Sequence, residues 1–224
     1  MDTLIGEVPD AWSARRLEDC CEVQSGPSGS VLTRSENVTG GVPVVKAGDV
    51  GPDGIALDPS ASIGPATAER LRKYRLESGD IVLVRIGQTS RHALATDEHR
   101  GWLLGSSCIR VRVLRDVLPA YLSCYLTHPA VKEWLAGNTN RGVLPTVNTS
   151  KIGSLPLVLP PLAVQESVVE VAKLIDAKIR AHRKVVEATG MLRDLLLPRL
   201  IAGVPMALTP SCDDSIENQR HLEA

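Results

Sequence analysis

Residues 155–197, LPLVLPPLAVQESVVEVAKLIDAKIRAHRKVVEATGMLRDLLL, join an apolar, strand-like run to a long helical pattern. Pro160 and Pro161 stand between the two patterns. Proline cannot continue a strand ladder, but it presets the φ angle of a first helical turn. The pair therefore predicts a junction at which a strand ends and a helix begins, and the rest of the chain is interpreted outward from it.

The pattern after the junction predicts one long amphipathic helix over residues 162–189. Apolar residues recur there at spacings of three and four, which gathers them on one face. Glu166 and Glu170 lie near the amino end and basic residues lie towards the carboxyl end, the order that the helix dipole favours. Such a helix spans roughly 40 Å at about 1.5 Å per residue. We expect it to project and to end at Pro198, although packing on its own domain fits the pattern equally well.

The apolar face of this helix predicts a pairing interface. Lys178 and His182 fall where a regular heptad seam would carry apolar residues, so we expect a mixed interface that fixes the register rather than a plain zipper. The predicted interface residues are Val168, Val171, Ile175, Ile179, His182 and Val186.

Length and composition fit a globular domain with an appendage. The chain has 224 residues, of which 43% are hydrophobic and 23% charged, and these values are ordinary for a soluble protein. Apolar runs fall far short of the ~18 residues that a membrane span needs, and the first ten residues lack a signal-peptide pattern, so we expect a cytoplasmic protein. Five cysteines without a CxxC spacing predict neither a disulfide framework nor a zinc site.

The charge is unevenly distributed along the chain. Residues 1–65 hold 4 Lys or Arg against 10 Asp or Glu, whereas residues 66–115 hold 10 against 5. A basic middle segment suits a face that meets phosphates. A solvated helix face gives the same count, so charge alone leaves both interpretations open.

The remaining patterns predict a mixture of strands and helices. Residues 41–50, 81–86 and 102–114 are typical of strands, and residues 66–74 and 118–135 of short helices. We therefore predict an α+β fold with a mixed-sheet domain over residues 1–158 and the long helix over 159–203. Residues 204–224 are polar and acidic, and we expect them to be disordered.

Polar loops that flank the predicted strands are candidates for DNA contacts. Amide side chains can pair with adenine, arginine can pair with guanine, and hydroxyl or lysine groups can fix phosphates. Asn, Ser and Thr are also common turn formers, so an ordinary turn remains the alternative. The candidate residues are Lys46, Arg85, Gln88, Ser90, Arg91, His92, Asn138, Asn140, Arg141, Asn148 and Lys151.

The junction resembles that of specificity subunits of Type I restriction–modification systems, where a sequence close to PLPPLxEQ precedes a long helix. Pro160, Pro161, Leu162 and Gln165 match it, whereas Val164 replaces the acidic residue before the glutamine. Residues 79–87, GDIVLVRIG, are similar to a second family segment of the form GDI-apolar-apolar-x-R-x-G. The resemblance covers most of residues 9–203.

This resemblance implies a target-recognition domain that reads double-stranded DNA, followed by a spacer helix. Typical members of the family carry two such units in one chain, each reading half of a bipartite site, and this chain carries one. It therefore resembles a half-length subunit that pairs with its own copy or with a second half-subunit. The implied partners are DNA methyltransferase subunits and an ATP-dependent restriction subunit, in a system of phage defence.

Catalysis by this chain is not predicted. The methyltransferase Asn/Asp-Pro-Pro-aromatic motif and the GxxxxGK[ST] phosphate loop are absent from the sequence, and the histidines form no HExxH set. We therefore expect no metal and no cofactor. Two alternatives remain open: a small autonomous nuclease that uses Cys20, Cys21 or His92 with Glu98, and a DNA-free adaptor that dimerises through the helix. An assay of the protein alone with metal and DNA separates them.

Overall fold

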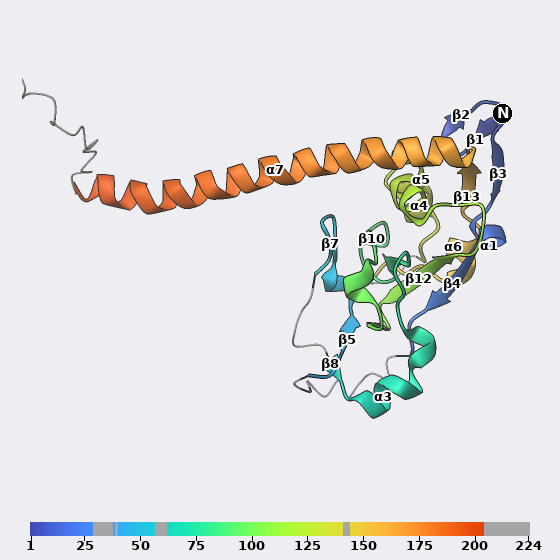
Figure 1. The fold of residues 1–224 in the computed structure, drawn as a ribbon, viewed down its shortest axis with the longest axis horizontal. Coiled ribbons are helices and arrows are strands. Elements are labelled where there is room, and N and C mark those ends of the chain that lie inside the picture. Colours follow the sequence, from blue (N-terminus) through green and yellow to red (C-terminus); the bar gives the residue numbers. More distant parts are fainter. Residues whose placement is uncertain (29–37, 39, 57–61, 141–143, 204–224) are drawn as a thin grey trace, which may run out of the picture. The chain divides into compact units, whose positions relative to one another are not determined.

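The computed structural model shows an α+β chain with a long C-terminal helix (Figure 1), as the sequence predicts. It describes residues 1–28, 38, 40–56, 62–140 and 144–203. The chain forms two compact units, Met1–Lys173 and Leu174–Ala224. The first unit holds all described strands and the beginning of the long helix. The predicted disorder of residues 204–224 lies outside the described residues.

The described helices and strands are interspersed along the chain. Their bounds are β1 Asp2–Thr3, β2 Gly6–Glu7, β3 Ser13–Arg16, α1 Leu17–Cys20, β4 Cys21–Ser25, β5 Val42–Val45, η1 Ala47–Asp49, β6 Val50–Gly51, β7 Gly54–Ile55, β8 Ser62–Ile63, α3 Pro65–Arg70, η2 Arg72–Tyr74, β9 Ile81–Val84, β10 His92–Leu94, η3 Asp97–His99, β11 Leu103–Leu104, β12 Cys108–Val113, α4 Pro119–Leu126, α5 Pro129–Gly137, α6 Thr149–Gly153, β13 Pro156–Leu159 and α7 Leu162–Ile201.

An antiparallel sheet in the order β10-β9-β12-β4 forms the centre of the first unit. Its strand β9 is buried on both faces, because successive side chains alternate across a sheet. Ile81 and Leu83 enter a core cluster with residues of α4 and α5, whereas Val82 and Val84 enter a second cluster with residues of β5, β6 and β7. This two-sided burial explains why the strand is an unbroken apolar run.

The predicted single strand over residues 102–114 is wrong, because this segment forms two strands in different sheets. β11 pairs in parallel with β5, which in turn pairs antiparallel with β8, while β12 lies in the central sheet. The chain changes sheet at Gly105, whose N–H donates to the carbonyl oxygen of Val45 over 2.9 Å. A side chain at position 105 would collide with that carbonyl group, so the close approach requires glycine.

The predicted strand-to-helix junction is confirmed. β13 pairs antiparallel with β3, Pro160 and Pro161 follow, and α7 begins at Leu162 (Figure 1). The side chain of Gln165, only 1% exposed, fixes the first turn of the helix. Its Oε1 accepts the N–H of Leu118 over 2.8 Å, and its Nε2 donates to the carbonyl oxygens of Asp116 and Pro160 over 3.1 and 3.0 Å.

The helix α7 is longer than predicted, because Pro198 lies inside it and does not end it. A proline removes one N–H group and crowds the preceding turn, but here the helix continues to Ile201, and the N–H of Ala202 still donates to the Pro198 carbonyl oxygen over 3.0 Å. The chain leaves the helix at Gly203, whose φ is +70°. Its 40 residues span about 60 Å. Of the helices that the structure describes, α7 included, none has a stretch long and apolar enough to cross a bilayer.

Candidate nucleic-acid interface

Two of the predicted DNA-contacting loops, more than fifty residues apart in the chain, pair with each other. Ile86 forms an antiparallel bridge with Thr146, and Thr146 forms a second bridge with Asn140. The N–H of Gly87 donates to the Pro145 carbonyl oxygen over 2.9 Å. Two further bonds run from the Val147 N–H to the Arg85 carbonyl oxygen over 3.0 Å and from the Asn140 N–H to the Thr146 carbonyl oxygen over 2.8 Å. We name residues 85–87, 140 and 144–147 the loop ladder.

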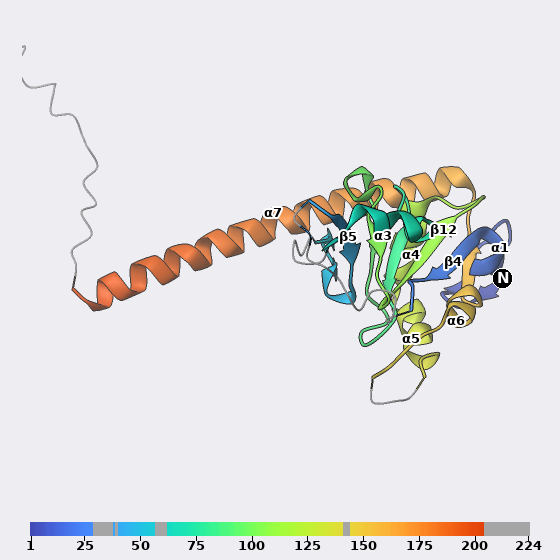
Figure 2. The same cartoon turned by 90° about the horizontal axis from the view of Figure 1, so that it is seen from below.

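One face of the loop ladder is turned towards solvent. Side chains opposite one another across a bridge share a face, so Ile86, Thr146 and Asn140 lie together on one side. Val147 lies on the other side and is buried in the main core. Burial of Val147 therefore anchors the ladder and leaves the face of Asn140 exposed. Figure 2 shows the chain passing from α5 to α6 through this segment.

The two sequence segments that contain the loop ladder carry basic residues and no Asp or Glu. Residues 81–96 and 134–165 contain no Asp or Glu, but they contain Arg85, Arg91, Arg141 and Lys151. Arg85 is half-buried and Lys151 is exposed, while Arg141 lies outside the described residues. Acid-free segments of this kind suit a polyanion such as DNA.

Two predicted asparagines have their side chains engaged in helix ends. The Oδ1 of Asn148 accepts the N–H of Lys151 over 2.8 Å and caps the first turn of α6. The Nδ2 of Asn138 donates to the Trp134 carbonyl oxygen over 2.9 Å at the end of α5. Asn138 therefore follows Gly137, the last residue of helix α5.

Arg91 and His92 are tied to neighbouring backbone. The guanidinium of Arg91 donates to the carbonyl oxygens of Ala47 and Val50, which holds the β6–β7 hairpin. The Nε2 of His92 donates to the Ser123 carbonyl oxygen in α4 over 2.9 Å. Burial lowers the pKa of His92, so the ring is neutral near pH 7. Both residues therefore position the loop that lies between β9 and β10.

The other predicted residues differ in exposure. The side chains of Lys46 and Gln88 are exposed, and Ser90 is half-buried. Lys46 precedes η1, where its backbone N–H donates to the carboxylate of Asp49 over 2.7 Å. The structure brings Gln88 into the loop next to the loop ladder, whereas Lys46 comes from the neighbouring β5–β6 segment.

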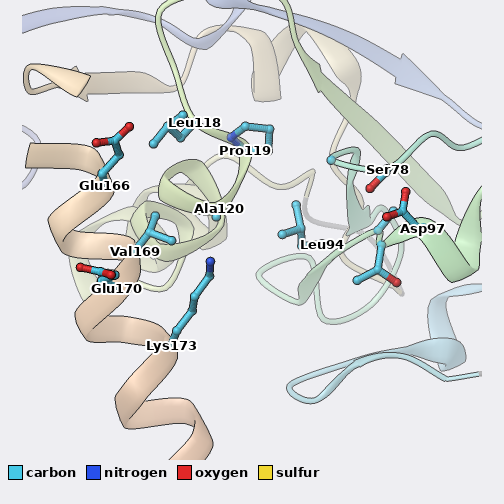
Figure 3. Close-up of a pocket in the computed structure, with 13 residues that line it drawn as sticks. Ser78, Leu94, Asp97, Leu118, Pro119, Ala120, Glu166, Val169, Glu170 and Lys173 are labelled. Carbon is cyan, nitrogen blue, oxygen red and sulfur yellow. The ribbon is translucent and has the colours of Figure 1, made fainter. Parts of the chain in front are cut away.

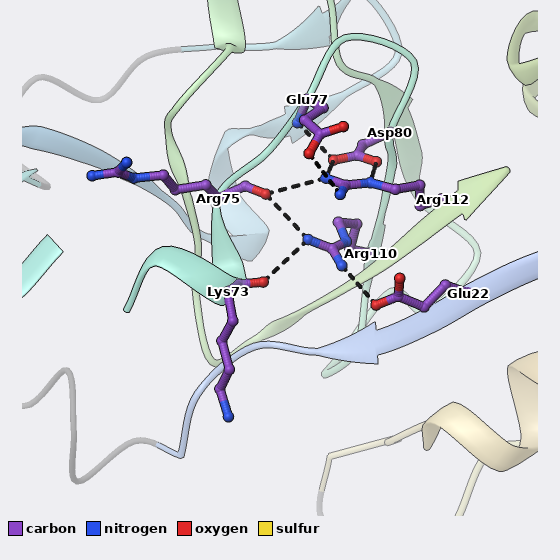
Figure 4. Close-up of polar contacts among 7 residues, drawn as sticks. All are labelled: Glu22, Lys73, Arg75, Glu77, Asp80, Arg110 and Arg112. Atoms are coloured by element: carbon purple, nitrogen blue, oxygen red, sulfur yellow. Dashed lines mark hydrogen bonds and ion pairs between the residues drawn. The ribbon is translucent and has the colours of Figure 1, made fainter. Parts of the chain in front are cut away.

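Two arginines of the basic segment 66–115 are engaged in internal contacts (Figure 4). Arg110, 3% exposed, pairs with Glu22 over 2.8 Å and also donates to two backbone carbonyl groups. Arg112 binds both carboxylate oxygens of the buried Asp80, over 2.7 and 2.8 Å. The hydrogen bond with Asp80 raises the pKa of Arg112. These two arginines hold β12 to the segment before β9, so they stabilise the fold rather than bind phosphates.

A cavity of about 780 Å³ lies where the beginning of α7 meets the beginning of α4 and the turn after β10 (Figure 3). Leu94, Leu118 and Val169 contribute its apolar surface. The charged lining residues are Asp97, Glu166, Glu170 and Lys173. Three carboxylates against one ammonium group would repel phosphates, so this cavity is unsuited to nucleic acid.

The cysteines considered for a nuclease are buried, and burial disfavours catalysis by their thiols. Burial raises the pKa of Cys20 and raises that of Cys21 to about 12, so neither thiol forms the reactive thiolate near pH 7. Cys108 is a buried core residue, and its pKa is also raised by burial to about 12. Among the described residues, no group of three or more His, Cys, Asp or Glu is arranged to hold a metal ion.

Comparison with known proteins gives consistent matches. The family model for the Type I restriction modification DNA specificity domain matches residues 9–187. The putative type I restriction enzyme MjaX specificity subunit of Methanocaldococcus jannaschii is 25% identical over 205 residues, which cover 88% of this chain and 47% of that protein.

Solved structures share the fold at low identity. The HsdS subunit from Thermoanaerobacter tengcongensis has a TM-score of 0.57 at 17% identity, covering 80% of this chain and 41% of its own. The type I restriction–modification S subunit from M. genitalium has a TM-score of 0.57 at 12% identity, and the match covers 89% of this chain and 49% of that chain. A chain from a structure of type I R-M complex assembly has a TM-score of 0.59 at 16% identity, and the match covers 85% of this chain and 45% of that chain. The present chain thus spans about half the length of these relatives.

Sequence reasoning did not single out Ile86, Leu144 and Thr146 as site residues. Ile86 and Leu144 are apolar, and apolar residues next to strands are usually assigned to the core, whereas Thr146 has the composition of an ordinary turn residue. Only the pairing of the two loops shows that Ile86 and Thr146 share the face of Asn140.

Proposed function

Because the chain belongs to the family of Type I restriction modification DNA specificity domains, we propose that it is a sequence-reading subunit of a type I restriction–modification system. It binds double-stranded DNA in the cytoplasm and directs methyltransferase and ATP-dependent restriction subunits to a bipartite site. The chain itself has no catalytic role. In this proposal residues 1–158 form the target-recognition domain and residues 159–203 the spacer helix.

The loop ladder is the observation that supports this proposal within the molecule. It joins two loops from acid-free segments and anchors them to the core through Val147. Rigid scaffolds with exposed polar loops are the usual arrangement for reading bases. In this proposal, some side chains of the interface read the bases and others bind the phosphates of the DNA backbone.

The predicted residues take two roles in this proposal. The amides of Gln88 and Asn140 read base edges, because an amide can pair with N6 and N7 of adenine. The groups that contact phosphates or guanine are Lys46, Arg85, Ser90, Arg141 and Lys151. Arg91, His92, Asn138 and Asn148 position the loops through their bonds to backbone atoms.

We further propose that the chain pairs with a second copy or with a different half-subunit through helix α7. Exposed apolar side chains of α7 supply a pairing surface, namely Val168, Val171, Ile175, Ile179 and Val186 together with His182. Two identical chains related by a two-fold axis would read inverted copies of one half-site.

Selection of random DNA duplexes by the purified full-length chain tests the recognition role. We expect enrichment of one sequence motif and an affinity that falls linearly with the logarithm of salt concentration, because bound phosphates release counterions. Asn140→Ala should weaken binding to the selected duplex by about 1–3 kcal/mol and leave binding to shuffled duplexes nearly unchanged. Arg220→Ala, in the terminal segment, is the control.

The same preparation separates the alternatives. DNA cleavage by the chain alone with Mg²⁺ would favour an autonomous nuclease. Self-association without any DNA binding would favour a dimerisation adaptor. Equal affinity for selected and shuffled duplexes would contradict sequence recognition.

A further inference from the structure

Two aliphatic side chains of the loop ladder are exposed to solvent. Ile86 is 37% exposed and Leu144 is 60% exposed. Ile86 is held in place by the bonds that its neighbours make across the ladder, from Gly87 to Pro145 and from Val147 to Arg85. Exposure of apolar area to water is unfavourable by about 25 cal/mol per Å². Exposed aliphatic groups in segments that contain no Asp or Glu therefore suggest a contact that covers them.

The composition of this face matches one edge of DNA. In the major groove an A·T pair presents N7 and N6 of adenine beside O4 and the C5 methyl group of thymine. An amide such as that of Asn140 suits the adenine edge, whereas only an apolar group suits the methyl. Asn140, Thr146 and Ile86 lie on three successive segments of the ladder. With about 4.8 Å between paired segments, they cover roughly 10 Å, or about three base-pair steps.

We propose, resting on the function proposed above, that Ile86 and Leu144 determine specificity by contacting thymine C5 methyl groups in the major groove. The amide of Asn140 and these aliphatic side chains together select A·T pairs at neighbouring positions of the half-site. A carboxylate at this face would oppose DNA, and the flanking segments 81–96 and 134–165 contain none.

Replacement of thymine by uracil isolates the methyl contact, because uracil keeps the pairing and the O4 acceptor and loses only the methyl group. The best duplex from random selection with the full-length chain is synthesised with uracil at one thymine position at a time, and its affinity is measured by fluorescence anisotropy. At one or two positions uracil should weaken binding about fourfold, the equivalent of about 0.8 kcal/mol for one buried methyl-sized group.

Variants assign the contact to the side chains. In Ile86→Ala or Leu144→Ala, the ratio of the affinities for the thymine and uracil duplexes should fall to about one at the affected position. At the other positions this ratio should stay unchanged. Leu114→Ala, one residue after β12 and similarly exposed at 64%, is the matched control and should keep the full preference. Thermal unfolding of each variant checks that it folds.

Several results would overturn the proposal. They are a selected site without thymine, equal binding of thymine and uracil at every position, and a thymine preference that survives both variants. Equal weakening of all duplexes by both variants, without methyl dependence, would instead indicate an apolar wedge between base steps and would equally reject methyl reading. Absence of any sequence-selective binding would reject the proposed function itself, a result distinct from these.

Discussion

Gln165 connects three backbone groups at the point where strand β13 gives way to helix α7. Its amide accepts from the N–H of Leu118 and donates to the carbonyl oxygens of Asp116 and Pro160, and the side chain is buried. Buried polar groups are costly unless hydrogen-bonded, and here both ends of the amide are satisfied. This single side chain therefore sets the start of the helix against the loop before α4.

Replacement of this glutamine by leucine should destabilise the fold. Gln165→Leu keeps the volume approximately but leaves one buried N–H and two carbonyl groups without this partner, at about 1–3 kcal/mol for an unsatisfied group. We expect a loss of about 2–4 kcal/mol in the free energy of unfolding, measured by urea denaturation. Glu166→Gln, one residue along and exposed, is the control and should stay within about 0.5 kcal/mol. Equal urea midpoints of unfolding for Gln165→Leu and Glu166→Gln would contradict a stabilising role of Gln165.

Charge patterns predict the chemistry of single residues only in part. Arg110 and Arg112 belong to the most basic stretch of the sequence, yet their partners Glu22 and Asp80 come from other strands and turns. A count of charges along the chain cannot show such pairs, because they form through the fold. The burial of Gln165 was not predicted either: the sequence showed only that this residue matches the family motif, since no local pattern distinguishes a buried amide from an exposed one.

At the scale of elements, local sequence patterns predicted the helices and strands whose bounds are set by a few neighbouring residues. Pro160 and Pro161 placed the start of α7, and the GDI segment placed β9, because proline φ angles and apolar runs act within a few residues. Gly105 broke a predicted strand for a non-local reason, the close approach of Val45. The loop ladder was beyond prediction, since its hydrogen bonds join residues more than fifty positions apart.

Helix α7 carries the prediction on assembly. Ile175→Asp would place an unpaired carboxylate in the proposed seam, where desolvation of the charge costs several kcal/mol. We expect light scattering to show a pair of chains for the wild type and single chains for the variant. Ala177→Asp lies about 200° around the helix from position 175, outside the seam, and should leave the pair intact. A wild type that is monomeric without partners would contradict self-pairing.

At the scale of the whole molecule, the proposed pairing relates the chain to its target. Helix α7, at about 60 Å, exceeds one DNA turn of about 34 Å. Two copies related by a two-fold axis would therefore read two half-sites separated by a spacer. A palindromic bipartite target follows from self-pairing, whereas an asymmetric target with a second specificity chain present would indicate two different halves.

Genome-wide mapping of DNA methylation tests the central claim most directly. The chain is expressed with its methyltransferase partner in a host that lacks both, beside the partner alone. We predict that one bipartite, palindromic sequence becomes methylated only when the chain is present. An identical methylation pattern with and without the chain would contradict the account, because the chain would then contribute nothing to the choice of sequence.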